Sequence, residues 1–393
     1  GRGTMAQTVR VNVPRTILDW VMSIGAKDHL GEGQRKNIDA WKQGTKRPTV
    51  SQLHDISDKL HVPFGYFFMD EPIDDTPPIY AKRTIGSQQP QGRPSRDLVD
   101  TTDQMTAIQD WARQDRIDNE GTRLGQVGSR TIDDDSKLIA EDIRQALKID
   151  ERWYRRSGLH EPAKAFKLLR ERAEGTGILI MQNGVVGNNT SRPLDPKEFR
   201  AFALIDPYAP LIFINRTDEP ETARLFSLVH ELAHVWLGAD ELYNDTTLPT
   251  GVTRLEQVCN EVGAAILLPD EDFLETWQSI PDDTTLDERM KKLKACFPVS
   301  HTTLALHALK HKLISQETFQ KCNQAAQTWS EGTKNQQHSG GDYYKNKLSR
   351  FDSRFLERMA SSVAEGRTTY LDAYRLTGTN GDTFTKLMKR AIS

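Results

Sequence analysis

The chain contains 393 residues, of which 37% are hydrophobic and 27% are charged, and its formal net charge is −3. A chain of this length is expected to form two to four units, and this composition suits a mostly helical protein with exposed linkers. The small negative charge argues against a protein that coats nucleic acid by bulk charge, although one small domain could still bind DNA locally.

The three cysteines show no C-x-x-C spacing, which argues against a disulfide framework and against a cysteine zinc site. This cysteine usage is typical of a cytoplasmic protein. No apolar run approaches the roughly 20 residues that span a bilayer, and the N-terminus carries no signal-peptide pattern. We therefore expect a cytoplasmic location and no membrane partner. Residues 1–14 are interpreted as a tag remnant, which ends before Met5, and a leader.

Residues 15–72 show apolar side chains at helical spacing. Residues 41–49 fit the pattern W-x-x-G-x-x-x-P-T, and a leucine-rich helix follows that Thr49 or Ser51 can cap. These features resemble an XRE-type helix-turn-helix domain. The resemblance weakens over residues 26–37, where Gly31 and Gly33 fit poorly with two well-formed helices.

The candidate DNA contacts in this domain are Lys42, Lys46 and Arg47. Basic and acidic residues are nearly balanced up to Pro72, which does not indicate a phosphate-binding surface. The alternative is a degenerate domain that serves dimerisation or the docking of a related repressor. Residues 73–135 are expected to form a proline-containing linker, one helix over 98–119 and a polar loop.

Residues 136–275 are expected to form an α+β core, in which a small sheet carries a helix around His230. Apolar runs predict strands at 177–181, 201–205 and 211–215, and periodic patterns predict helices at 137–147 and 163–173.

The sequence His230-Glu231-Leu-Ala-His234 lies within an apolar run that Gly238 can end. Residues four apart on a helix share a face, so both imidazoles can bind one metal ion. Glu231 can then reach a metal-bound water as the general base. Three fixed residues also arise by chance, so this motif alone does not establish a metal site.

A second predicted helix, stopped by Pro269, supplies the acid that a catalytic zinc site needs as its third protein ligand. Glu256 is our candidate ligand, and Asn260, one turn later on the same face, can orient a ligand imidazole. Glu261 lies about 140° round the helix from Glu256, so it is not expected to share the ligand role.

Helices are expected to continue through a C-terminal subdomain at 276–330, followed by a polar linker at 331–341 and a helical module at 342–393. His301, His307 and His311 could suggest a metal site. Their spacing is not expected to converge on one face, so they are interpreted as partly exposed helix residues.

These segments together resemble the ImmA/IrrE family of metallo-endopeptidases, most closely over residues 184–269. The resemblance rests on four features: the segment 184–204, the strand at 209–215, the H-E-x-x-H helix and the helix that ends at Pro269. The family pattern E-x-x-A-N-x-F-A-A matches Glu256 and Asn260, while Cys259 replaces the usual alanine. Val262 and Gly263 replace Phe-Ala.

The resemblance implies a zincin-like zinc endopeptidase that cleaves or inactivates an XRE-type repressor or antitoxin and so regulates mobile-element, stress or toxin–antitoxin genes. It assigns His230, His234 and Glu256 as metal ligands, Glu231 as the base and Asn260 as the supporting residue. Such a His2Glu site also accepts Mn2+ or another divalent ion.

An oxyanion donor is not evident in the sequence, and Tyr243 and His160 are the weak candidates. Two other functions stay open: a DNA-binding regulator with a structural or sensory zinc site, and a toxin–antitoxin component that acts by forming a complex. The protein can be an oligomer in each case.

Overall fold

The computed structural model describes residues 9–80, 92–217, 220–239, 253–322 and 343–392, and the backbone of residues 242–243. The chain divides into two compact units, and the division falls inside α5 (Arg96–Asp118), after Asp103. Each unit has its own cluster of buried hydrophobic side chains.

The first unit contains the short helices α1 (Arg15–Ile24), α2 (Glu32–Lys42) and α3 (Val50–Leu60). The hydroxyl of Thr49 accepts a hydrogen bond from the amide of Gln52 and so caps α3. Between α1 and α2 lies one 3₁₀ turn, η1 (Lys27–His29), and a second turn, η2 (Phe64–Phe68), follows α3. As expected, residues 26–37 do not form two α-helices.

The second unit is organised by a four-stranded sheet of strand order β1-β5-β4-β6. β1 (Leu179–Asn183) runs parallel to β5 (Leu211–Asn215), whereas β4 (Ala201–Leu204) is antiparallel both to β5 and to β6 (Leu242–Tyr243). All residues of β4 and β5 are buried, which explains their continuous apolar sequence.

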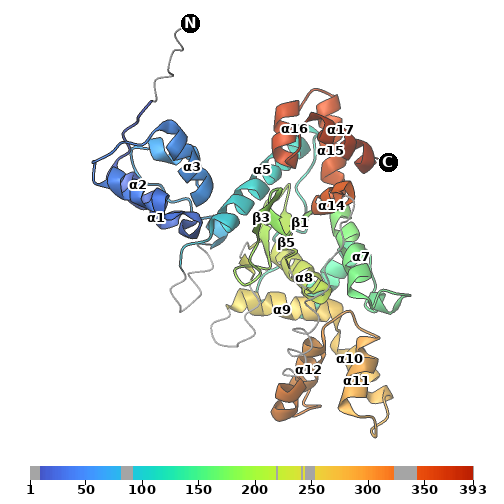
Figure 1. Cartoon of the computed structure of the whole chain (residues 1–393). Coiled ribbons are helices and arrows are strands. Elements are labelled where there is room, and N and C mark those ends of the chain that lie inside the picture. The colour runs from blue at the N-terminus through green and yellow to red at the C-terminus, as the bar shows by residue number, and fades with distance from the viewer. Residues whose placement is uncertain are drawn as a thin grey trace. The chain divides into compact units, whose positions relative to one another are not determined.

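The central helix of this unit is α8 (Glu221–Leu237), which packs across β4 and β5 (Figure 1). Around α8 pack α6 (Ser136–Leu147), α7 (Pro162–Gly175) and α9 (Arg254–Leu267). The side chain of Asp135 caps α6, and Thr253 caps α9. The 3₁₀ turn η3 (Trp153–Arg155) joins α6 to α7 and supplies two buried aromatic rings.

Beyond this core, the helices whose bounds the structure gives are α10 (Asp270–Ser279), α11 (Leu286–Lys294), α12 (His301–Lys310), α14 (Tyr343–Arg350), α15 (Ser353–Ala364), α16 (Tyr370–Thr377) and α17 (Gly381–Ile392). Ser300 caps α12 through the amide of Thr303. None of the helices in the described part of the chain combines the length and apolar character needed to cross a bilayer.

The C-terminal helices pack directly on the core of the second unit. Arg170 of α7 donates hydrogen bonds to the backbone carbonyls of Ser349 (2.7 Å) and Phe351 (2.5 Å). The carboxylate of Asp352 caps α15 through the amide of Phe355 and also accepts from the amide of Ile180 in β1. This module is therefore tied to both α7 and the first strand of the sheet.

The structure confirms the predicted fold class, a mostly helical α+β protein with a small sheet. The sequence did not predict the hairpin of β2 (Val185–Val186) and β3 (Asn189–Pro193) or the strand β6. This hairpin is short, and β3 is polar and largely exposed. β6 contains only two residues, which is too short for a periodic signal.

Gly238 ends α8 and is expected to tolerate no side chain. Its φ is +65°, and a Cβ at this position would lie 2.9 Å from the Cα of Gly128. Gly238→Ala should lower the free energy of unfolding by clearly more than the ~1 kcal/mol that a left-handed backbone costs by itself. Gly366→Ala is the matched control, because Gly366 has a φ of +73° and open space around it. Equal losses in urea unfolding would contradict this account.

Candidate metal centre

The H-E-x-x-H sequence occupies the most buried part of α8. His230, Glu231 and His234 are each 0% exposed. The apolar residues between and after them, such as Leu232 and Val235, belong to the hydrophobic cluster of the second unit. A helix with polar side chains at this depth needs internal partners for them, because burial without partners is costly.

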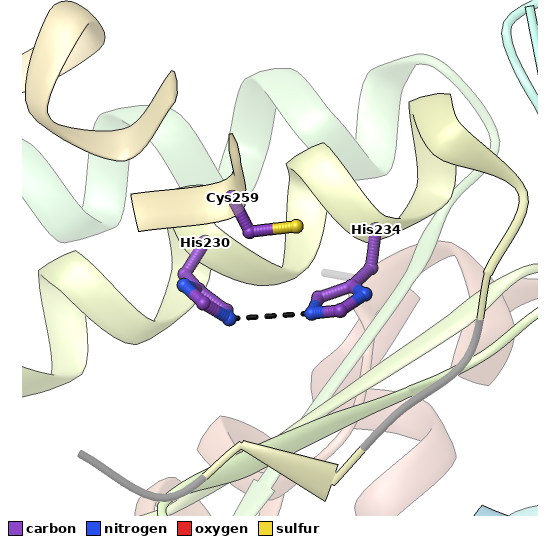
Figure 2. Close-up of side chains that lie close together, drawn as sticks. All are labelled: His230, His234 and Cys259. Carbon is purple, nitrogen blue, oxygen red and sulfur yellow. Dashed lines mark hydrogen bonds between the residues drawn. The ribbon is translucent and has the colours of Figure 1, made fainter. Parts of the chain in front are cut away.

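The two imidazoles point their Nε2 atoms at each other, 3.2 Å apart (Figure 2). The Nδ1 atom on the other side of each ring forms a hydrogen bond. Nδ1 of His234 lies 2.9 Å from the backbone carbonyl of Ala239, which can only accept, so this nitrogen donates. Nδ1 of His230 donates likewise to Oδ1 of Asn260, at 3.0 Å. In the neutral form each Nε2 therefore presents a lone pair to the space between the rings.

The carboxylate of Glu256, on the first turn of α9, closes this space. Its Oε2 lies 3.2 Å from Nε2 of His230, and its Oε1 lies 3.0 Å from Nε2 of His234. Burial acts to raise the pKa of Glu256, but the two imidazoles outweigh it and hold that pKa well below its usual range. Burial also lowers the pKa of His230. Burial acts to lower the pKa of His234 as well, but Cys259, Glu256 and Glu231 outweigh it and raise that pKa well above its usual range. An anionic carboxylate thus faces two imidazole nitrogens that a proton or a metal cation can bridge.

This donor set fits a divalent zinc ion. Ligand bonds of about 2.0–2.1 Å at tetrahedral angles place neighbouring donors about 3.3 Å apart. The separations of 3.0–3.2 Å among the two Nε2 atoms and the Glu256 oxygens are close to that value. Two lone pairs and a carboxylate at such distances repel one another unless a cation or a proton lies among them.

The thiol of Cys259 is a second candidate donor. The Sγ atom and the two imidazole nitrogens all lie within 4.8 Å of one another, and the thiol points toward the imidazole pair from α9 (Figure 2). Cys259 is fully buried, and burial raises the pKa of its thiol. We favour Glu256 as the third ligand, because its oxygens lie 3.0–3.2 Å from the two imidazole nitrogens and its side chain is partly exposed, which suits a site with an open position.

The other candidate residues of this core lie at different places. Glu231 follows His230 on α8. The carboxylate of Glu261 does not join the ligands and accepts a hydrogen bond from Ser136, at 2.6 Å. His160 lies in the turn before α7 and belongs to neither of the two groups of potential ligands that the described side chains form. The side chain of Tyr243 lies outside the described residues.

The candidate DNA contacts lie around the end of α2 in the first unit. Lys42 forms an ion pair with Asp19, with Nζ 2.7 Å from Oδ1. Lys46 and Arg47 are exposed, and the backbone carbonyl of Arg47 accepts a hydrogen bond from Arg10. Their role in DNA binding stays a prediction.

The predicted partial exposure was wrong for His307, which is buried, whereas His311 is partly exposed as predicted. The expectation that these histidines do not share a face was wrong for His307 and His311. His307 is only 7% exposed, and its ring centroid lies 4.9 Å from that of His311. They are four residues apart, the same spacing that aligns His230 with His234, so they share one face. His301 does not join them in the group of potential ligands.

Sequence reasoning missed the carbonyl of Ala239, which fixes the tautomer of His234. A backbone acceptor carries no residue-type signal. The carbonyl of Ala239 lies beside His234 because the chain leaves α8 through Gly238, whose backbone is in the left-handed conformation that commonly ends a helix.

Glu256→Gln should weaken zinc binding at least about tenfold, because a neutral amide replaces the anionic ligand. Cys259→Ala should change the affinity by less than about threefold, because three ligands remain. Zinc affinity is measured by competition with a chromophoric chelator. The zinc ion of this centre is identified as the equivalent that is lost in the His230→Ala variant. The opposite ranking of the two variants would identify Cys259 as the third ligand.

Comparison with protein families supports this geometry. Residues 173–310 match the model of the IrrE N-terminal-like domain, peptidase M78, and residues 351–390 match a domain of unknown function, DUF8813. The comparisons with curated proteins and with solved structures found no match. The first match contains α8, α9 and both imidazoles, whereas the second covers most of α15–α17. Residues 173–310 therefore form a domain similar to the IrrE N-terminal-like domain, and this match supports the resemblance to the ImmA/IrrE family.

Proposed function

We propose that the protein is a zinc-dependent endopeptidase that cleaves or inactivates an XRE-type repressor or antitoxin. The observation that carries the catalytic part is the convergence of two Nε2 lone pairs and one carboxylate, with a further buried carboxylate, Glu231, next to His230. The match to peptidase M78 supports the same reaction class.

A bound zinc ion would supply Lewis-acid polarisation of the scissile carbonyl and a water of lowered pKa. The protein's own residues have separate roles. Glu231 accepts the proton of the attacking water and delivers it to the nitrogen of the leaving amine. Asn260 and the Ala239 carbonyl hold the two imidazoles in the tautomer that leaves Nε2 free to ligate.

A peptide substrate is consistent with the sheet beside this centre. β6 lies at one edge of the sheet and pairs with β4, which packs against α8. Edge strands can bind an extended peptide by adding it to the sheet. The repressor or antitoxin as the protein substrate rests on the family resemblance and on the XRE-like sequence of the first unit, which can dock a related protein.

Glu231→Gln should abolish cleavage while zinc content and fold are retained, because only the proton acceptor is lost. The full chain is incubated with an XRE-family repressor, with and without a chelator, and products are identified by mass spectrometry. We expect defined fragments from the parental protein and none after chelation. Glu261→Gln is the matched control, because its carboxylate bonds to Ser136 and should not affect cleavage.

Cleavage by Glu231→Gln at the parental rate would contradict the role of the base. A stable, uncleaved complex with the repressor would contradict the proteolytic part of the proposal and indicate regulation by binding alone.

A further inference from the structure

A second group of potential metal ligands lies in the helices that follow α9. Asp270 is the first residue of α10, and His307 and His311 lie at the end of α12. Nε2 of His307 and Nε2 of His311 are each 3.0 Å from Oδ1 of Asp270. These separations resemble those among His230, His234 and Glu256 and are again close to the spacing of donors around one ion.

The Nε2 atom of His307 supplies an independent indication. It is buried and has no hydrogen-bond partner among the described atoms, because the Oδ1 atom at 3.0 Å lies outside hydrogen-bond geometry. The ring itself is held in place by Phe273, whose ring packs edge-on against it with centroids 4.8 Å apart. Buried polar atoms in native proteins nearly always have a partner, and a bound cation would be that partner for this nitrogen.

The simplest alternative is a network of ion pairs around Asp270. His311 forms a hydrogen bond with Oδ1 of Asp270, and Lys310 and Lys137 lie 3.7 and 3.5 Å from its oxygens. This network satisfies Asp270 and His311 but gives Nε2 of His307 no hydrogen bond of regular geometry, only the ion-pair contact of 3.0 Å with Oδ1 of Asp270. Both lysine side chains are more than 60% exposed, so they can turn into solvent when a cation binds.

We propose that Asp270, His307 and His311 form a second site for a divalent ion of the zinc class. Two imidazole nitrogens and one carboxylate favour Zn2+, Co2+ or Ni2+ over Mg2+ and Ca2+, which prefer oxygen ligands. The site lies past the end of α9 that is opposite to Glu256, and that end is about 16 Å from Glu256 by the rise of an α-helix. It is therefore separate from the centre on α8.

The expected role of this site is to fasten α12 to the start of α10. Asp270 and His311 are 41 residues apart in the sequence, and α11 lies between them. An ion that binds both ends stabilises the folded arrangement by mass action, because the unfolded chain does not hold the three donors together.

The test uses the full chain with His230→Ala and His234→Ala, so that the first centre is removed and only the proposed site is measured. This double variant is loaded with Zn2+, dialysed against a chelator-buffered micromolar concentration and analysed by native mass spectrometry. We expect one zinc ion per chain, and we expect Tm to rise on zinc addition. Adding His307→Ala or Asp270→Asn should abolish both effects or weaken binding at least about tenfold.

His301→Ala in the same double variant is the matched control, because His301 lies on α12 outside the group and should leave binding unchanged. Asp270→Asn also guards against misfolding, because it keeps the side-chain shape, and circular dichroism monitors the helices of every variant. A double variant that holds no zinc, or zinc retained undiminished after both His307→Ala and Asp270→Asn, would overturn the proposal.

Discussion

The structure of the candidate metal centre depends on two imidazoles whose Nε2 atoms face each other in the buried interior of the second unit. The carbonyl of Ala239 and the amide oxygen of Asn260 fix both Nδ1 atoms as donors, so neither ring can turn its lone pair away. Glu256 adds a carboxylate at 3.0–3.2 Å. Such an arrangement needs a cation or a shared proton among the three groups, and the spacing of the donors fits a metal ion, which is why it indicates a metal site more strongly than the sequence motif does.

The surrounding fold fixes the positions of α8 and α9 relative to each other. α8 is buried by the sheet and by α6, α7 and α9, and its end is set by Gly238, whose close approach to Gly128 leaves no room for a side chain. The C-terminal module reaches the same core through Arg170 and Asp352, which link it to α7 and β1. The helices matched to the domain of unknown function are therefore part of the unit that contains the candidate metal centre.

Much of this could be predicted from the sequence wherever spacing along one element decides the geometry. The four-residue spacing of His230 and His234, and of Glu256 and Asn260, placed these side chains on shared helix faces. The buried strands β4 and β5 were readable from their continuous apolar runs. The same rule applied to His307 and His311 would have paired them, but the convergence with Asp270 depends on how α10 and α12 pack, which no local pattern encodes. The Ala239 carbonyl, the two-residue β6 and the approach of Cys259 are likewise products of tertiary structure.

The most direct test of the central claim is X-ray absorption at the zinc edge of the full chain carrying His307→Ala, which leaves the centre on α8 as the zinc site. The account predicts a first shell of nitrogen and oxygen only, at about 2.0–2.1 Å, with the outer scattering of two imidazoles. A sulfur neighbour at about 2.3 Å would assign Cys259 instead of Glu256. A chain that retains no zinc would contradict the account as a whole.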